Sequence, residues 1–173
     1  MDTREILEKV KNGSITVEEA ERIFRRQPFE EMGYAKLDTH RKLRSGFPEV
    51  VFCSGKATEH ILHIYQKLYE ENGEVFGTRA SAEQYEALRP HLPKLEYDPL
   101  SRIMKIEKPE KEHAGKIAVC TAGTADIPVA EEAAQTAEYF GSYVERIYDV
   151  GVSGIHRLLS RLEMIQSANC VIA

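Results

Sequence analysis

The chain has 173 residues, of which 42% are hydrophobic and 29% charged, and its formal net charge is −5. This length and composition predict one globular domain, or a small domain beside part of a second. The acidic balance argues against a protein built mainly to hold nucleic acid, and no apolar run reaches the ~18 residues that a membrane span needs. We therefore expect a cytoplasmic protein that binds neither nucleic acid nor a membrane.

The three cysteines, Cys53, Cys120 and Cys170, lie far apart in the sequence and form no CxxC pair. This spacing indicates neither a disulfide framework nor a zinc site. Each cysteine lies in an apolar, strand-like run, so we expect three buried and unreactive thiols.

Residues 1–33 are predicted to form a pair of short helices. The run REILEKVKNG ends at Gly13, a residue suited to a left-handed helix cap. Thr16 and Glu19 have the spacing of a capping box at the start of a second helix. The apolar stripe along both helices is modest, so we expect the pair to dock on other parts of the protein.

Residues 34–112 are predicted to form a small α+β domain. Residues 34–38 and 49–53 have strand character, and the basic segment between them predicts a hairpin. Thr58 is expected to cap the helix EHILHIYQKLYEEN, and EVFGTRA and SAEQYEALRPHL follow as a strand and a helix. The alternating run LEYDPLSRIMKIEK predicts an edge strand or a hairpin.

Residues 113–173 have the β-α-β-α-β pattern of a parallel sheet. KIAVC, YVERIYDV and CVIA are the predicted strands, and residues 127–140 and the run GIHRLLSRLEMI are the predicted helices. Three parallel strands with two crossover helices make half of a doubly wound α/β sheet. We expect this sheet to be incomplete at its C-terminal end, and the chain to be a fragment of a longer protein.

Two loops follow the carboxyl ends of the first two of these strands, so both are expected at one edge of the sheet. The first loop is Thr121-Ala122-Gly123-Thr124-Ala125-Asp126, whose hydroxyls and backbone N–H groups suit a phosphate. Asp126 can cap the following helix or bind a ribose hydroxyl. The alternative is that these small residues serve only a tight turn and close packing.

The second loop spans residues 149–157, and its two glycines, Gly151 and Gly154, let the backbone approach a ligand. His156 offers a titratable ring and Arg157 a fixed fork for a phosphate. A lone histidine at a helix start is usually structural. A His-Arg pair in a Gly-rich corner beside another phosphate-like loop favours a functional site.

A third cluster is basic and gathers His40, Arg41, Lys42 and Arg44 with Lys56 and Arg79. In isolation such a cluster is typical of a solvated turn. In an acidic chain it is also suited to neutralising an anionic ligand, such as the pyrophosphate of a dinucleotide.

The run TAGTADIPVAEEAAQTAEYFGSYVERIYDVGVSGIHRLL resembles the LarB family, whose carboxy-terminal domain is similar to the purine-biosynthesis carboxylase PurE. LDTHRKLRSGFPEVVFCSGK and GTRAS are similar to the amino-terminal half of that family. The resemblance covers most of residues 34–173 and implies a PurE-like, flavodoxin-type sheet in the last third of the chain.

The resemblance implies an enzyme that carboxylates the pyridinium ring of nicotinic acid adenine dinucleotide and hydrolyses its phosphoanhydride. The products would be pyridinium-3,5-biscarboxylic acid mononucleotide and AMP, the first step towards the nickel-pincer nucleotide cofactor of lactate racemase. Carbon dioxide or bicarbonate would supply the carboxyl group, and Mg²⁺ would assist. The family also implies a homo-oligomer, with an octamer expected for the full-length protein.

Together these arguments assign catalysis to His156 and Asp126. The residues expected to bind substrate are Thr121, Ala122, Gly123, Thr124, Asp149, Gly151, Gly154, Arg157, Arg41, Arg44, Lys56 and Arg79. No metal ligand is assigned. The nucleophilic cysteine of the family lies in a segment downstream of this sequence, and we expect none of the three cysteines present to replace it.

Two other functions stay open at this stage. One is a PurE-type carboxylase or mutase acting on aminoimidazole ribonucleotide, although the loops here have Gly-Thr-Ala-Asp and Ser-Gly-Ile-His-Arg where PurE has Gly-Ser-x-Ser-Asp and Ser-Ala-His-Arg. The other is a non-catalytic nucleotide-binding or assembly module, which would bind the ligand without turning it over.

Overall fold

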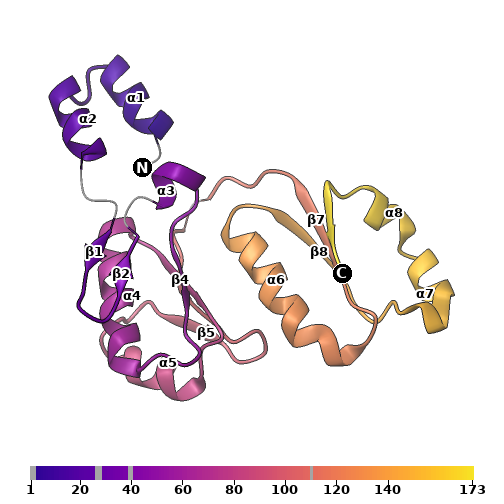
Figure 1. The fold of residues 1–173 in the computed structure, drawn as a ribbon. Coiled ribbons are helices and arrows are strands. Elements are labelled where there is room, and N and C mark those ends of the chain that lie inside the picture. The colour runs from indigo at the N-terminus through magenta and orange to yellow at the C-terminus, as the bar shows by residue number, and fades with distance from the viewer. Residues whose placement is uncertain (1–2, 26–28, 39–40, 110) are drawn as a thin grey trace. The chain divides into compact units, whose positions relative to one another are not determined.

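The computed structural model describes residues 3–25, 29–38, 41–109 and 111–173. Its contacts divide the chain into two compact units, residues 1–50 and residues 51–173. The first unit opens with α1 (Thr3–Lys11) and α2 (Val17–Phe24), so the expected pair of helices is confirmed (Figure 1). Among the described helices, none has both the length and the apolar character that a bilayer crossing requires.

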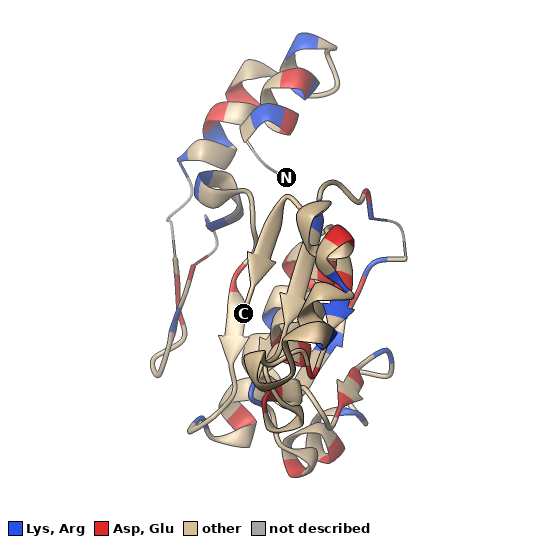
Figure 2. Cartoon of the chain, turned by 90° about the vertical axis from the view of Figure 1, so that its right-hand side faces the viewer, with Lys and Arg blue, Asp and Glu red and all other residues tan. Residues whose placement is uncertain are grey.

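The starts and ends of these two helices follow from local hydrogen bonds. Thr16 Oγ1 accepts from the Glu19 amide at 3.1 Å, and the Glu19 carboxylate accepts from the Thr16 amide at 2.8 Å, which confirms the capping box. Gly13 takes a left-handed backbone (φ +75°), as expected after α1. Acidic and basic residues both occur along the two helices (Figure 2).

The predicted basic hairpin is wrong. Strand β1 (Glu30–Glu31) pairs antiparallel with β2 (Lys36–Leu37), and the basic segment that follows is a short helix, α3 (Arg41–Ser45). Arginine, lysine and leucine all favour helix, and the Ser45 hydroxyl bonds back to the Arg41 carbonyl one turn earlier, at 2.9 Å. Strand β3 (Val50–Phe52) neighbours β4 (Val75–Thr78) instead of β2.

Residues 51–108 of the second unit form a compact region that we call the α+β part. Its sheet has the order β3-β4-β6-β5, and both β4 and β5 run antiparallel to β6, which confirms the hairpin. Ile61, Tyr65 and Leu68 bury one face of the long helix α4, and the Tyr65 hydroxyl donates to the Met104 carbonyl at 2.8 Å. The elements after β3 are α4 (Thr58–Asn72), β4 (Val75–Thr78), α5 (Ala82–Leu88), β5 (Glu96–Asp98) and β6 (Ile103–Ile106).

The helix α4 does not begin as predicted. Its N-cap is Ala57, which makes no side-chain capping bond, and Thr58 is already the first helical residue. The backbone of the preceding turn is held instead by Gln84, whose amide donates to the Cys53 carbonyl at 3.3 Å and to the Lys56 carbonyl at 3.4 Å.

Residues 113–173 form a second region, which we call the sheet part, and it confirms the α/β prediction. Its three strands are parallel in the order β8-β7-β9. Helix α6 covers one face of this sheet, and α7 and α8 lie on the other face (Figure 1). The elements are β7 (Lys116–Cys120), α6 (Ile127–Tyr139), β8 (Tyr143–Ile147), α7 (Ile155–Leu159), α8 (Leu162–Gln166) and β9 (Cys170–Ile172).

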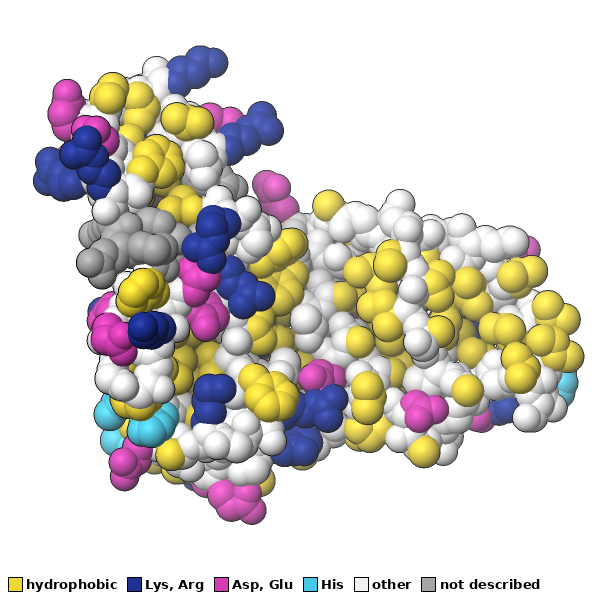
Figure 3. Space-filling model, viewed as in Figure 1, with side chains coloured by type: hydrophobic (Ala, Val, Ile, Leu, Met, Phe, Trp, Pro, Cys, Tyr) yellow, Lys and Arg dark blue, Asp and Glu magenta, His cyan; other side chains and the backbone are white. Residues whose placement is uncertain are grey.

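The second helix of this region was predicted as one piece, and that prediction is wrong. The helix breaks between α7 and α8, because Arg161 leaves the helical range (φ −110°) and the Ser160 hydroxyl bonds to the Arg157 carbonyl at 2.7 Å. The break divides the apolar side chains of this run between the core and the surface. Leu158 and Ile165 pack on the core, whereas Ile155, Leu159 and Leu162 stay exposed among the hydrophobic side chains that Figure 3 shows over this region.

Candidate functional site

The two loops meet at the edge of the sheet where β7 and β8 end. Thr121 follows β7, and its carbonyl accepts from the Val150 amide at 2.9 Å. The Ala122 carbonyl accepts from the Gly151 amide at 2.9 Å, and Thr121 Oγ1 accepts from the Asp149 amide at 3.1 Å. The backbone pairing of the parallel strands therefore continues into both loops and joins them into one surface.

Two glycines have different roles at this junction. A Cβ atom on Gly151 would lie 2.6 Å from the Ala122 carbonyl oxygen, so the contact between the loops requires glycine at this position. A Cβ atom on Gly123 would meet nothing within 4 Å, and the Gly123 backbone is extended (φ −138°). The first loop is therefore open on the side of Gly123, where a ligand can approach the backbone.

The exposed part of the first loop is small and polar. Thr124–Asp126 forms a single 3₁₀ turn in which the Asp126 amide donates to the Gly123 carbonyl at 3.4 Å. Ala122, Thr124 and Asp126 are exposed, whereas Thr121 is buried. The predicted capping role of Asp126 is wrong, because its side chain makes no capping bond to α6. Its carboxylate stays available for a ligand.

Asp149 and Arg157 form an ion pair within the second loop. Arg157 Nη1 lies 2.5 Å from Asp149 Oδ2, and both side chains are partly exposed. Asp149 takes a left-handed backbone (φ +58°), a conformation that costs about 1–3 kcal/mol for such a residue and persists only where its surroundings fix it. A Cβ atom on Gly154 would lie 2.8 Å from Arg157 Nε, so Gly154 leaves room for this guanidinium.

His156 and Asp126, the two predicted catalytic residues, lie on separate elements. His156 is exposed in the first turn of α7, and Asp126 is exposed just before α6. Neither side chain forms an ion pair or a hydrogen bond with another residue of the described ranges. Both side chains are therefore available to contact a bound ligand.

The four basic residues predicted to bind substrate lie on other elements than the two loops. Arg41 and Arg44 belong to the first unit, where Arg44 pairs with Asp38. In the second unit, Lys56 Nζ donates to the Phe52 carbonyl at 2.7 Å. Arg79 pairs with Glu132 of α6 at 2.5 Å. Of the other two basic residues in that cluster, His40 lies outside the described residues, and for Lys42 only the backbone is described.

The thiols differ from the sequence expectation. Cys53 is fully buried, and burial raises the pKa of its thiol despite the neighbouring Tyr65 and Lys56. Burial also raises the pKa of Cys120, which is only partly buried at the end of β7. Cys170 is exposed on β9, so the expectation of three buried cysteines is wrong at that position. Cys53 and Cys120 therefore favour the protonated, less nucleophilic form.

Arg102 belongs to none of the motifs that the sequence offers. This residue has a left-handed backbone (φ +59°), as does Arg79 (φ +55°). The Arg102 guanidinium donates to the Ala80 carbonyl at 3.0 Å and to the Arg79 carbonyl at 3.3 Å. No local pattern in the sequence marks a left-handed arginine, and only the folded contact between the two turns reveals this pair.

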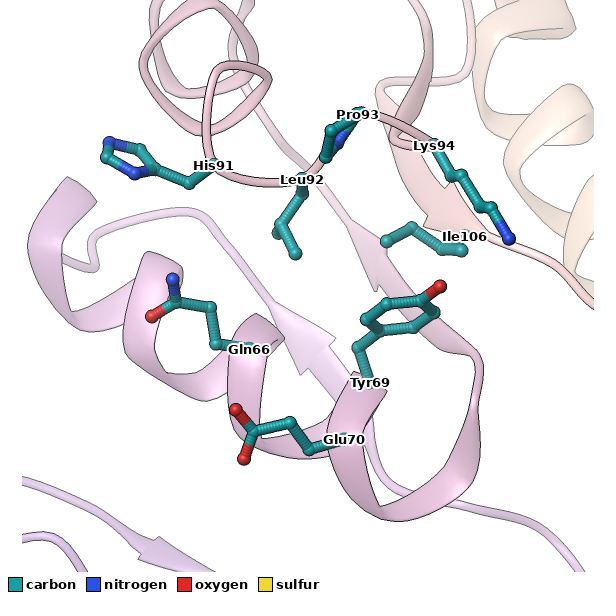
Figure 4. Close-up of a pocket in the computed structure, with 8 residues that line it drawn as sticks. All are labelled: Gln66, Tyr69, Glu70, His91, Leu92, Pro93, Lys94 and Ile106. Atoms are coloured by element: carbon teal, nitrogen blue, oxygen red, sulfur yellow. The ribbon is translucent and has the colours of Figure 1, made fainter.

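A separate pocket of about 390 Å³ lies in the α+β part (Figure 4). Leu92 and Ile106 point into it, beside the ring of Tyr69, and Gln66, Glu70, His91, Pro93 and Lys94 complete its lining. None of the residues predicted to bind substrate lines this pocket. Within the described residues, no group of three or more His, Cys, Asp or Glu side chains is placed to hold a metal ion.

Comparison with known proteins gives two matches. The family model of the LarB/PurE-like N-terminal domain matches residues 29–108. An uncharacterized protein of Methanocaldococcus jannaschii is 38% identical over 180 aligned residues, which cover 98% of this chain and 70% of that protein.

Proposed function

This chain belongs to the LarB/PurE-like family, a carboxylase-type enzyme family, and from that premise we propose that it acts on nicotinic acid adenine dinucleotide. The proposed reaction carboxylates the pyridinium ring and hydrolyses the phosphoanhydride, and the products are pyridinium-3,5-biscarboxylic acid mononucleotide and AMP. This would be the first step towards a nickel-pincer nucleotide cofactor. The observation that carries the proposal is the union of the two loops at the carboxyl edge of β7 and β8.

The joined loops support the binding of a dinucleotide, because they form one surface with two kinds of phosphate contact. The open backbone around Gly123 offers N–H groups to one phosphate. Arg157 offers a guanidinium, which is shared with Asp149 in the ligand-free protein. A pyrophosphate carries enough negative charge to compete with the Asp149 carboxylate for that guanidinium.

Bond cleavage and carboxylation both need proton transfer or charge stabilisation near the ligand. Asp126 and His156 are the unpaired titratable groups that the two loops present, and we assign proton transfer to them. Mg²⁺ commonly binds through one or two carboxylates together with substrate phosphates, and no residue of this chain is assigned to it. The ion would offset phosphate charge during hydrolysis. Because burial keeps Cys53 and Cys120 protonated, no step is assigned to either thiol.

The proposal is tested by incubating the protein with nicotinic acid adenine dinucleotide, bicarbonate and Mg²⁺. AMP release is followed by chromatography and the mononucleotide by mass spectrometry. Because the nucleophilic cysteine of the family is expected downstream of this sequence, we expect both products from the full-length protein. In that protein we expect a large loss in Asp126→Asn and His156→Gln, and no loss in Glu163→Gln, an exposed control on α8. Release of AMP without a gain of carboxyl mass would contradict the carboxylase assignment.

A parallel incubation uses aminoimidazole ribonucleotide as the substrate. Turnover of that compound alone would replace the proposal by the PurE reaction, which the PurE-like character of the family keeps as the second candidate. Binding of the dinucleotide without either product would assign the chain to the non-catalytic nucleotide-binding class.

A further inference from the structure

Helix α6 connects the first loop to the α+β part. It begins at Ile127, directly after Asp126, and runs without a break to Tyr139. One side of the helix packs on its own sheet, where Ala130 and Ala134 are buried against Val119. The opposite side, formed by residues 132, 135 and 139, contacts residues of the α+β part.

Three contacts hold this opposite side. Arg79 Nε lies 2.5 Å from Glu132 Oε2. The Gln135 amide donates to the Asp98 carboxylate at 2.6 Å. At the end of the helix, the Tyr139 ring packs on Phe76 with 4.4 Å between the ring centroids. Positions 132, 135 and 139 are three and four residues apart, so the contacts form one stripe along the helix.

The partners on the α+β part are themselves fixed. Arg102 bonds to the Arg79 and Ala80 carbonyls, and the Ala80 amide donates to the Arg102 carbonyl at 2.9 Å. These bonds hold the left-handed turn that carries Arg79. Asp98 accepts from the Ser101 hydroxyl at 2.6 Å and from the Ser101 amide at 3.1 Å. The two polar contacts to α6 therefore come from residues, Arg79 and Asp98, whose conformation is set within the α+β part.

The first loop has little packing of its own. Four of its six residues are exposed, and Gly123 faces open space. The second loop holds Thr121 and Ala122 at its first end, so the conformation of the exposed residues 123–126 depends strongly on where α6 begins. An α-helix is a stiff rod, so a shift of α6 against its sheet moves the residues that precede Ile127.

We propose that the α+β part positions the first loop by holding α6, and that Arg79 is a positioning residue for the loop through its pair with Glu132. Arg79 then serves the ligand indirectly, in place of the direct phosphate contact expected from the sequence. The expected effect of Arg79 on dinucleotide binding rests on the proposed function. Its expected effect on the order of the first loop applies to the ligand-free protein as well.

The first test measures amide hydrogen exchange of residues 122–127 by mass spectrometry in the full chain without ligand. We expect exchange at least twofold faster in Arg79→Met and in Glu132→Gln, no further increase in the double variant, and partial rescue in Arg79→Lys. The control is Arg89→Met, which removes an exposed pair with Glu86 on α5. Wild-type exchange in both single variants would overturn the proposal.

The second test measures the dissociation constant for nicotinic acid adenine dinucleotide by titration calorimetry. We expect a rise of about two- to fivefold in both Arg79→Met and Glu132→Gln, the range for a partly exposed ion pair. Weaker binding in Arg79→Met alone would show direct contact with the ligand and overturn the positioning role. If the wild type binds no dinucleotide, the proposed function fails, and the exchange test still decides the inference.

Discussion

The backbone amide of Gly151 donates a hydrogen bond to the carbonyl oxygen of Ala122, 2.9 Å away. This bond joins two loops that lie almost thirty residues apart in the sequence and face the same edge of the sheet. It leaves no room for a side chain at Gly151. The candidate site is therefore a property of the pair of loops, and each loop alone holds only part of it.

Replacing Gly151 with alanine is expected to separate the two loops. The new Cβ atom would lie 2.6 Å from the Ala122 carbonyl oxygen, and the backbone must shift to relieve the clash. We expect a loss of about 1–3 kcal/mol in the free energy of unfolding, as for other overpacked sites, together with weaker dinucleotide binding. Urea denaturation measures the first effect. Gly123→Ala is the matched control for stability, because its Cβ atom meets open space, and equal losses in the two variants would contradict the account.

Replacing Arg157 with alanine is expected to weaken dinucleotide binding by about 1.5–3 kcal/mol, the range for a charge-assisted hydrogen bond. Stability should change by less than about 1 kcal/mol, because the pair with Asp149 is partly exposed. Calorimetric titration and thermal denaturation of the same samples separate the two effects. An unchanged dissociation constant would remove Arg157 from the site.

Lys111 contacts both regions of the second unit. Its Nζ lies 3.1 Å from Glu74 and 3.2 Å from Glu107, and it donates to the Tyr139 carbonyl at 2.6 Å. Lys111→Met leaves the buried Glu74 carboxylate without its cation, whereas Glu107 keeps its pair with Lys105, so we expect a loss of about 3 kcal/mol in the free energy of unfolding. The control is Lys108→Met, at an exposed position, with an expected change below about 0.5 kcal/mol. Similar losses in the two variants would refute the role given to Lys111.

Acid is expected to destabilise the protein through Glu131. Burial raises the pKa of this carboxyl, but hydrogen bonds from Arg146 and Tyr148 outweigh burial and lower it. A lowered pKa in the folded state means that the unfolded state binds the proton first. The stabilisation is therefore complete above the unfolded pKa of about 4.3 and is lost as the pH falls through the lower, folded pKa.

Urea denaturation between pH 6 and pH 3 checks this dependence. We expect Glu131→Gln to be less stable than the wild type at pH 6 and to lose less stability on acidification. Glu163→Gln, on the exposed side of α8, should keep the wild-type slope. A wild-type slope in Glu131→Gln would assign the acid sensitivity to other carboxyls.

Much of the fold could be predicted because its signals are local. The capping box at Thr16, the apolar run of β7 and the alternation of β5 and β6 each lie within a few residues, and each prediction is confirmed. The sequence also predicted that the two loops would meet, since the carboxyl ends of parallel strands share one edge of the sheet.

Most of the wrong or missed predictions concern features that no local sequence pattern specifies. The break at Arg161 depends on one backbone angle within an otherwise continuous apolar pattern. The pair of Arg79 with Glu132 joins residues more than fifty positions apart, so its effect on the site is visible only in the folded chain. The basic segment at Arg41 has strand-like neighbours, but its own residues favour helix.

The claim that the two loops form one nucleotide site is tested most directly by locating the bound dinucleotide. Amide hydrogen exchange of the full chain is compared with and without nicotinic acid adenine dinucleotide at saturating concentration. We predict slower exchange in residues 121–127 and in residues 149–157 together, with no change around the pocket that Leu92 and Ile106 line. Protection confined to that pocket, or absent from either loop, would contradict the claim that the two loops form one nucleotide site.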